Sequence, residues 1–131
     1  ALRVGKTRFV DYLRRFGFTE KTEILLSGEQ AGKLTDPGND VNYSRMSYGY
    51  GVSVTPLQVA CAYAAIANDG MRMKPRVVQS LLSNDGALVR EYPPEGAQRV
   101  VSVKTARQMR AALETVMGPN ATGRRGNVPG Y

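Results

Sequence analysis

The feature that most constrains this fold is a segment near the middle of the chain, Leu57 to Ala67, in which every side chain except Gln58 is apolar or tyrosine. Thr55 is suited to cap a helix over this segment, because its hydroxyl can accept a hydrogen bond from a free amide of the first turn. Pro56 fits the first helical position, and Gln58 has the spacing of a capping box. Gly70 can adopt the left-handed conformation that often ends a helix. We therefore predict a capped helix that ends before Gly70.

A helix that is apolar on every side is either buried in a core or embedded in a membrane. Crossing a bilayer takes about 20 apolar residues, and this segment is much shorter. We therefore predict that it is the central helix of a core, with Cys61 as a small buried hydrophobe. The single cysteine excludes a disulfide framework, and the lack of histidine excludes histidine-based metal sites and bases. We predict no metal and no cofactor.

A second helix is predicted from Lys6 to Phe16, where Phe9, Leu13 and Phe16 recur at helical spacing. Gly17 ends it, and Phe18 can fold back on the last turn as in a Schellman motif. Ala1 to Val4 resembles the last turn of a preceding helix.

A third helix is predicted to begin after the N-cap Ser102 and to end at about Met117, before Gly118-Pro119. It carries an apolar stripe at helical spacing, which is typical of a core-facing side. The stripe consists of Ala106, Met109, Leu113, Val116 and Met117.

Two β-favourable runs, Val77 to Leu82 and Ala87 to Tyr92, flank the turn Ser83 to Gly86 and predict a hairpin. An isolated hairpin is marginally stable in water, so we expect it to pack on a helix or join a larger sheet. Ser27 to Val41 is rich in Gly, Asp, Asn and Pro and is predicted to be a long loop. The fold class is therefore mainly α with one β-hairpin, in one domain or part of one.

The chain is strongly basic, with a net charge of +7 and an isoelectric point near 9.9. Such a charge is compatible with nucleic acid, an anionic membrane surface or an acidic cell-wall polymer as partner. The basic residues are scattered from Arg3 to Arg125 in runs of no more than two. This pattern favours a solvated basic surface over a nucleic-acid footprint.

The order of several segments resembles the transpeptidase domain of penicillin-binding proteins, most closely the class B type. The resemblance implies that residues 1–131 are a partial transpeptidase domain, the helical lobe of the α+β serine DD-transpeptidase fold. The most specific segment is SYGYGVSVTPLQVACAYAAIANDG at Ser47 to Gly70. The other matching segments are FVDYLRRFGF at Phe9 to Phe18, LSGEQAG at Leu26 to Gly32, KPRVV at Lys74 to Val78, VSVKTARQMRAALETV at Val101 to Val116 and ATGRRGNVPGY at Ala121 to Tyr131.

The three motifs that carry the chemistry of this family are missing from the chain. They are Ser-x-x-Lys with the acylated serine, Ser-x-Asn and Lys-Ser/Thr-Gly, and no serine or lysine here has the required neighbours. In the family, segments like Ala1 to Val4 and Val128 to Tyr131 lie just after the second motif and just before the third. We therefore expect the chain to be the interval between them, with no catalytic residue. By itself it should neither hydrolyse peptide nor bind penicillin covalently.

The resemblance implies an enzyme that cross-links peptidoglycan stem peptides on the outer, periplasmic face of the bacterial cytoplasmic membrane, in cell division or the maintenance of cell shape. A serine attacks the D-Ala-D-Ala carbonyl, an oxyanion hole stabilises the intermediate, and a second stem peptide resolves the acyl-enzyme. β-Lactams acylate the same serine. The implied partners are stem peptides, β-lactams and the rest of the transpeptidase domain. A membrane anchor would lie outside this chain, and no nucleic acid is implied.

In relatives with the same Tyr-Gly-Tyr-Gly pattern, the tyrosines lie beside the active site, which implies a substrate-binding role for Tyr48, Gly49 and Tyr50. Many family members carry another residue, such as Gln, at the position of Tyr50. The glycines permit a tight backbone, and the tyrosines offer flat amphipathic surfaces. The alternative is that one or both tyrosines pack against neighbouring helices.

Two other functions stay open at this point: a non-catalytic scaffold or interaction module derived from the transpeptidase domain, and a basic helical domain that binds nucleic acid. Flanking sequence with Ser-x-x-Lys upstream and Lys-Thr-Gly downstream would distinguish the enzyme from the scaffold. Nucleic-acid binding would show a steep dependence on salt.

Overall fold

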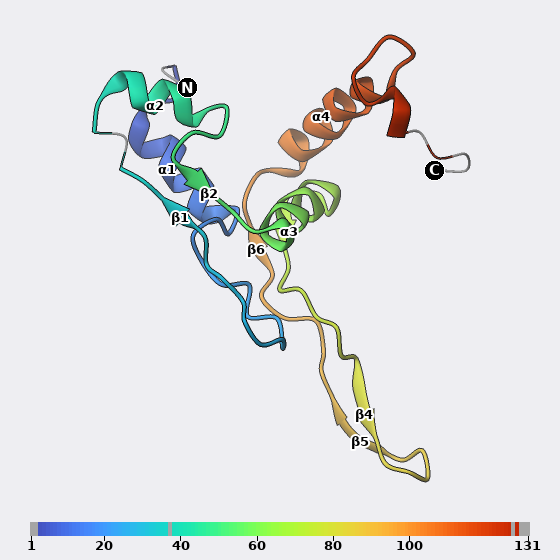
Figure 1. Cartoon of the computed structure of the whole chain (residues 1–131). Helices are drawn as coiled ribbons and strands as arrows, with labels where there is room; N and C mark the ends of the chain where they lie inside the picture. The colour runs from blue at the N-terminus through green and yellow to red at the C-terminus, as the bar shows by residue number, and fades with distance from the viewer. Residues whose placement is uncertain (1–2, 37, 127, 129–131) are drawn as a thin grey trace.

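The computed structural model describes residues 3–36, 38–126 and 128. Figure 1 shows α3 at the centre, with a lobe of α1 and α2 on one side, α4 on another, and a long hairpin pointing away from both. The helices are α1 (Lys6–Arg15), α2 (Asp40–Met46), α3 (Pro56–Ala67) and α4 (Val103–Glu114), followed by the short 3-10 helices η1 (Thr115–Met117) and η2 (Arg124–Gly126). The strands are β1 (Lys33–Leu34), β2 (Val52–Ser53), β3 (Met71–Arg72), β4 (Ser80–Leu82), β5 (Leu88–Glu91) and β6 (Gln98–Arg99).

The predicted caps of α3 are confirmed. The Thr55 hydroxyl accepts a hydrogen bond from the Gln58 amide at 3.1 Å, and the Gln58 side chain accepts one from the Thr55 amide at 2.8 Å. Gly70 has φ 85° and donates its amide to the Ala65 carbonyl at 2.8 Å. Its missing side chain matters as well, because a Cβ there would lie 2.3 Å from the Val101 carbonyl oxygen.

The predicted end of α1 is also confirmed. Gly17 has φ 89°, and its amide donates to the Arg14 carbonyl at 2.8 Å. The Phe18 amide donates to the Leu13 carbonyl at 3.0 Å, which completes a Schellman motif. At the preceding segment, Arg3 and Val4 form a turn, while Ala1 and Leu2 lie outside the described residues.

The strands form three antiparallel pairs, β1 with β2, β3 with β6, and β4 with β5. The last pair is the predicted hairpin, and the Gly86 amide closes its turn on the Ser83 carbonyl at 2.9 Å. The other two pairs were not predicted. The prediction of one long loop from Ser27 to Val41 is wrong, because β1 lies within it and α2 begins there at Asp40. A two-residue strand has no periodicity to detect, since its pairing comes from a distant segment.

The buried apolar residues are few, and they lie on α2, on α3, just after β6 and on α4. They are Tyr43, Met46, Ala65, Val100 and Ala106. The prediction that α3 is buried on every side is wrong for this chain: only Gln58 and Ala65 of the helix are buried, and Tyr63 is 60% exposed. Packing against β3 and α4 covers only part of its surface.

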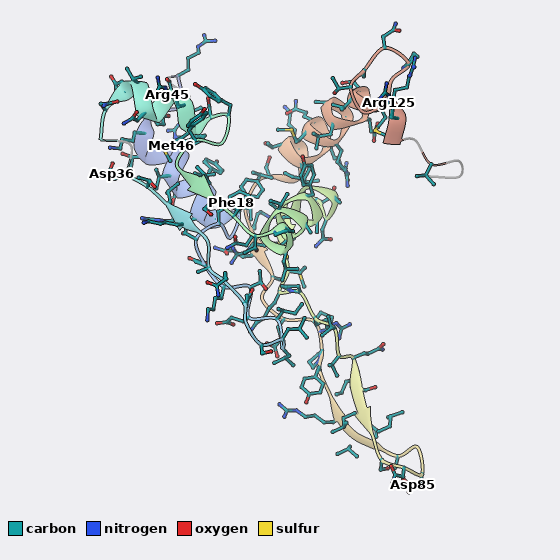
Figure 2. The ribbon with its side chains drawn as sticks, viewed as in Figure 1. Phe18, Asp36, Arg45, Met46, Asp85 and Arg125 are labelled. Carbon is teal, nitrogen blue, oxygen red and sulfur yellow. The ribbon has the colours of Figure 1, made fainter. Side chains whose placement is uncertain are left out.

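The apolar stripe of α4 is likewise open to solvent, because Ala106 is its only fully buried member. Every residue of β4 and β5 is exposed, so the expectation that the hairpin packs on a helix or larger sheet is not met in this chain. Figure 2 shows the side chains standing free along the hairpin, with Asp85 at its tip.

None of the described helices is long and apolar enough to cross a membrane.

Candidate substrate-facing loop

The Tyr48 to Gly51 loop lies between α2 and β2, so α2 determines where the loop begins. The side chain of Asn39 caps α2 by accepting a hydrogen bond from the Asn42 amide at 2.9 Å. Tyr43 packs edge to face against Phe9 of α1, with ring centroids 5.7 Å apart, and Met46 is buried one turn later. The Phe9–Tyr43 contact joins α2 to α1, and Met46 buries the C-terminal end of α2.

The loop itself continues α2 into a second Schellman motif. The Gly49 amide donates to the Met46 carbonyl at 3.1 Å, and the Tyr50 amide donates to the Arg45 carbonyl at 3.2 Å. Gly49 has φ 101°, a conformation that glycine adopts at little cost. A Cβ on Gly49 would meet no atom within 4 Å. Glycine is therefore favoured at this position by its positive φ and not by a lack of space for a side chain.

The far end of the loop is held by the β1–β2 pair. The Thr35 amide donates to the Gly51 carbonyl at 2.8 Å, next to the register pair of Leu34 with Val52. Gly51 also has positive φ, at 71°. The loop is therefore hydrogen-bonded at both ends to regular structure.

The two tyrosines of the loop project into solvent. Tyr48 is 67% exposed and Tyr50 is 65% exposed. Their rings contact each other edge to face, with centroids 5.7 Å apart and planes at 75°. Such a pair offers apolar faces for stacking together with phenolic hydroxyls for hydrogen bonds.

The loop carries no group suited to covalent chemistry or metal binding. Within the described ranges no cluster of three or more His, Cys, Asp or Glu side chains could hold a metal ion. The lone thiol, Cys61, lies on α3 and is only half-buried, not fully buried as predicted, and its partial burial raises its pKa. The arrangement is suited to contact and orient a ligand.

Comparison with known proteins identifies the class. The penicillin-binding protein transpeptidase domain matches residues 1–131. The chain is 40% identical to penicillin-binding protein PbpB of Mycolicibacterium smegmatis over 139 aligned positions, covering all of this chain and 21% of that protein. It is 29% identical to peptidoglycan D,D-transpeptidase FtsI of Escherichia coli, again covering all of this chain and 21% of the relative.

Solved structures agree with this match. The apo form of penicillin-binding protein 3 from Mycobacterium tuberculosis superposes with a TM-score of 0.88 at 36% identity, covering 99% of this chain and 31% of that one. Its complex with ampicillin gives a TM-score of 0.87. The chain belongs to the penicillin-binding protein transpeptidase domain family, and its relatives include PbpB, PBP3 and FtsI, as expected for the class B type. It spans about a fifth of the length of the curated relatives it matches.

Proposed function

We propose that this chain is part of a peptidoglycan DD-transpeptidase, in which it supplies helical scaffold and one wall of the substrate cleft. Two relatives support this proposal. FtsI is a peptidoglycan D,D-transpeptidase, and the mycobacterial PBP3 has been crystallised with ampicillin. The observation that carries the proposal is the exposed pair of Tyr48 and Tyr50 on a loop anchored at both ends.

In this proposal the bond-making groups lie elsewhere in the enzyme. A serine attacks the D-Ala-D-Ala carbonyl of one stem peptide, D-Ala leaves, and an amine of a second stem peptide releases the acyl-enzyme. No serine of this chain is followed by lysine three positions later, so none has the pattern of the acylated serine. The reaction would take place on the outer face of the cytoplasmic membrane, where peptidoglycan lies.

The tyrosines would act by holding the stem peptide or the side chain of a β-lactam against the cleft. An aromatic contact contributes about 0.5–1.5 kcal/mol beyond the area it buries. A loop that is already ordered loses little entropy when the ligand binds, so that contribution is largely retained. Gly49 supports the role indirectly, because its positive φ turns the chain between the two rings.

The test is the substitution Tyr50→Ala in the full-length protein. We expect the rate of acylation by a labelled penicillin to fall about fivefold to tenfold, which corresponds to about 1–1.4 kcal/mol of lost contact. The matched control is Tyr92→Ala, which removes a tyrosine at the base of the distant hairpin. An acylation rate for Tyr50→Ala equal to that of the unchanged protein would contradict the cleft-wall role.

A second measurement concerns this chain alone. Because it has no Ser-x-x-Lys motif, we expect no covalent adduct when it is incubated with labelled penicillin and separated on a denaturing gel. A labelled band at 14.3 kDa would show that the nucleophile lies within these residues and would overturn the proposed division of roles.

The basic charge does not favour nucleic-acid binding as a second function. Several arginines are engaged within the chain: Arg110 donates to the Ala67 carbonyl at 2.6 Å and to Asp69 at 2.8 Å. Arg99 donates to the Asp69 carbonyl at 3.0 Å. The non-catalytic scaffold alternative predicts no acylation of the full-length protein by labelled penicillin, so the same experiment separates it.

A further inference from the structure

A cavity of about 280 Å³ lies between the C-terminal end of α1, the segment after it, α3 and β3, and none of the tyrosine-loop residues lines it. Phe16, Cys61 and Met73 contribute apolar wall, and the backbone of Gly17 and Gly96 contributes polar wall. The volume is close to the lower end of the roughly 300–1,000 Å³ typical of small-molecule sites. The cavity therefore suits a small ligand.

Arg72 is the charged group that is best placed inside this cavity. Its side chain is 25% exposed, and its guanidinium lies against Gly17, where a Cβ would be 2.2 Å from Nη1. Glu20 Oε2 is 3.8 Å from Arg72 Nη2, which is too long for a hydrogen bond. Within the described residues no hydrogen bond from this guanidinium is formed, and no buried side-chain polar atom lacks a partner, so its five N–H donors are open to solvent in the cavity. A partly buried guanidinium with free donors is a site for a planar oxyanion such as a carboxylate.

The exposed part of the cavity lining carries negatively charged side chains, opposite in charge to Arg72. The side chains of Glu20 and Glu23 are 58% and 70% exposed, and Glu95 lies on the same rim. Lys74 neutralises part of this charge, because its Nζ is 2.5 Å from Glu23 and 3.9 Å from Glu95. Among the described residues Glu20 is paired only with Arg72, at 3.8 Å, so its 58% exposed carboxylate can still bind a ligand cation next to Arg72.

The floor is held rigid by Gln58, which is 1% exposed. Its Nε2 donates to the Glu20 carbonyl at 2.7 Å and to the Ala31 carbonyl at 2.8 Å, with the Gly17 carbonyl at 3.3 Å. Both N–H donors of the Gln58 amide are thus used. Gln58 therefore holds the backbone around the cavity in place and has no donor left for a ligand.

We propose that this cavity binds a small zwitterion of the α-amino acid class, with its carboxylate on Arg72 and its ammonium beside Glu20. The lining favours this class because a cation and an anion of the protein lie next to each other, as the two charges of an α-amino acid do. The lining contains three acidic and three basic side chains, Glu20, Glu23, Glu95, Lys21, Arg72 and Lys74, so a ligand without net charge matches it.

The experiment is calorimetric titration of the full-length protein, after its penicillin-reactive site has been acylated so that only other sites are measured. The probes are L-alanine, propionate with the carboxylate alone, and ethylamine with the ammonium alone. We expect L-alanine to bind most tightly, propionate more weakly and ethylamine weakest. Equal binding of L-alanine and propionate, or no binding of L-alanine, would overturn the proposal.

Two substitutions assign the charges. Arg72→Gln should weaken the binding of L-alanine and propionate about tenfold or more, the loss of a charge-assisted hydrogen bond. Glu20→Gln should weaken the binding of L-alanine and leave the affinity for propionate unchanged. The control is Arg107→Gln, which alters an arginine that is 67% exposed on α4. If Arg72→Gln fails to fold, Glu20→Gln decides the matter, and unchanged L-alanine affinity in that variant overturns the proposal.

The result is separable from the proposed function. The cavity can bind L-alanine whether or not the protein is acylated by penicillin, because the residues invoked differ from Tyr48 and Tyr50. Failure of acylation with retained, Arg72-dependent binding would contradict the transpeptidase proposal alone. Normal acylation without L-alanine binding would contradict the cavity proposal alone.

Discussion

At the scale of single residues, Gln58 joins more of this chain than any other described side chain. It caps α3 through Oε1, and its Nε2 holds carbonyls of the α1 terminus and of the segment from Glu20 to Ala31. Gln58 is 1% exposed and its hydrogen bonds are buried or partly buried, where an unpaired polar group costs free energy. One side-chain amide therefore holds three carbonyls that lie 27 to 41 residues away from it in the sequence.

We expect Gln58→Leu to lower the free energy of unfolding by about 3 kcal/mol, because it removes the cap and leaves buried carbonyls unpaired. Urea denaturation of the full-length protein, followed by circular dichroism, measures the effect. The control Gln30→Leu replaces an exposed glutamine and should change the midpoint little. A loss at position 58 as small as that at position 30 would show that the carbonyls find other partners.

At the scale of elements, the segment between α1 and β1 is ordered by a carboxylate rather than by regular structure. Glu29 accepts hydrogen bonds from the Thr22 amide at 2.6 Å, the Thr22 hydroxyl at 2.5 Å and the Glu23 amide at 3.0 Å. Glu23 has φ 60°, which is uncommon for a residue other than glycine. The Thr22 hydroxyl and the two amides lower the pKa of Glu29, since they stabilise its ionised form.

This shift predicts the direction of a pH effect on the segment. Because the pKa of Glu29 is lower in the folded state than in the unfolded state, its contribution is present above the unfolded value and is lost as the pH falls through the folded value. We expect the hydrogen-exchange protection factors of the Thr22 and Glu23 amides, which are corrected for the intrinsic pH dependence of exchange, to fall on acidification. Glu29→Gln should remove that pH dependence, whereas Glu114→Gln on α4 should leave it intact. A dependence that survives in Glu29→Gln would assign it to another group.

At the scale of the whole molecule, the chain exposes far more surface than a compact protein of its mass. Its solvent-accessible surface is 9698 Å², whereas a compact monomer of 14.3 kDa exposes about 6,800 Å². The excess comes from open faces of α3 and α4 and from the projecting hairpin (Figure 1). Apolar side chains lie on all three, among them Tyr63, Met109 and Leu88. Exposed apolar patches of this kind mark surfaces that associate with other protein.

We therefore expect the isolated chain to be marginally stable or to form oligomers. Its buried core is small relative to the conformational entropy lost on folding, so the open faces should drive association. Sedimentation velocity across a range of concentrations measures the mass, and a thermal melt measures cooperativity. A monomer that melts in one sharp, concentration-independent transition would contradict this expectation.

Local chemistry explains which parts of the fold could be predicted. The capping box of α3, the Gly17 termination of α1 and the turn of the β4–β5 hairpin each depend on neighbours within a few residues, so the sequence alone identifies them. The short helix α2 was missed because it lies in a Gly- and Asn-rich stretch with no apolar periodicity long enough to detect. The order of segments identified the family.

The sequence by itself thus determined the helix caps, the hairpin and the family, because each rests on residues close together in the chain or on their order. Only the tertiary structure decided that Gln58 binds three distant carbonyls and that the tyrosine loop begins on an α2 anchored by Phe9 and Tyr43. It also decided that α3, whose sequence is almost entirely apolar, leaves Tyr63 and much of its surface exposed to solvent. Burial and long-range hydrogen bonds depend on which distant segments meet, and no local pattern of side chains specifies that.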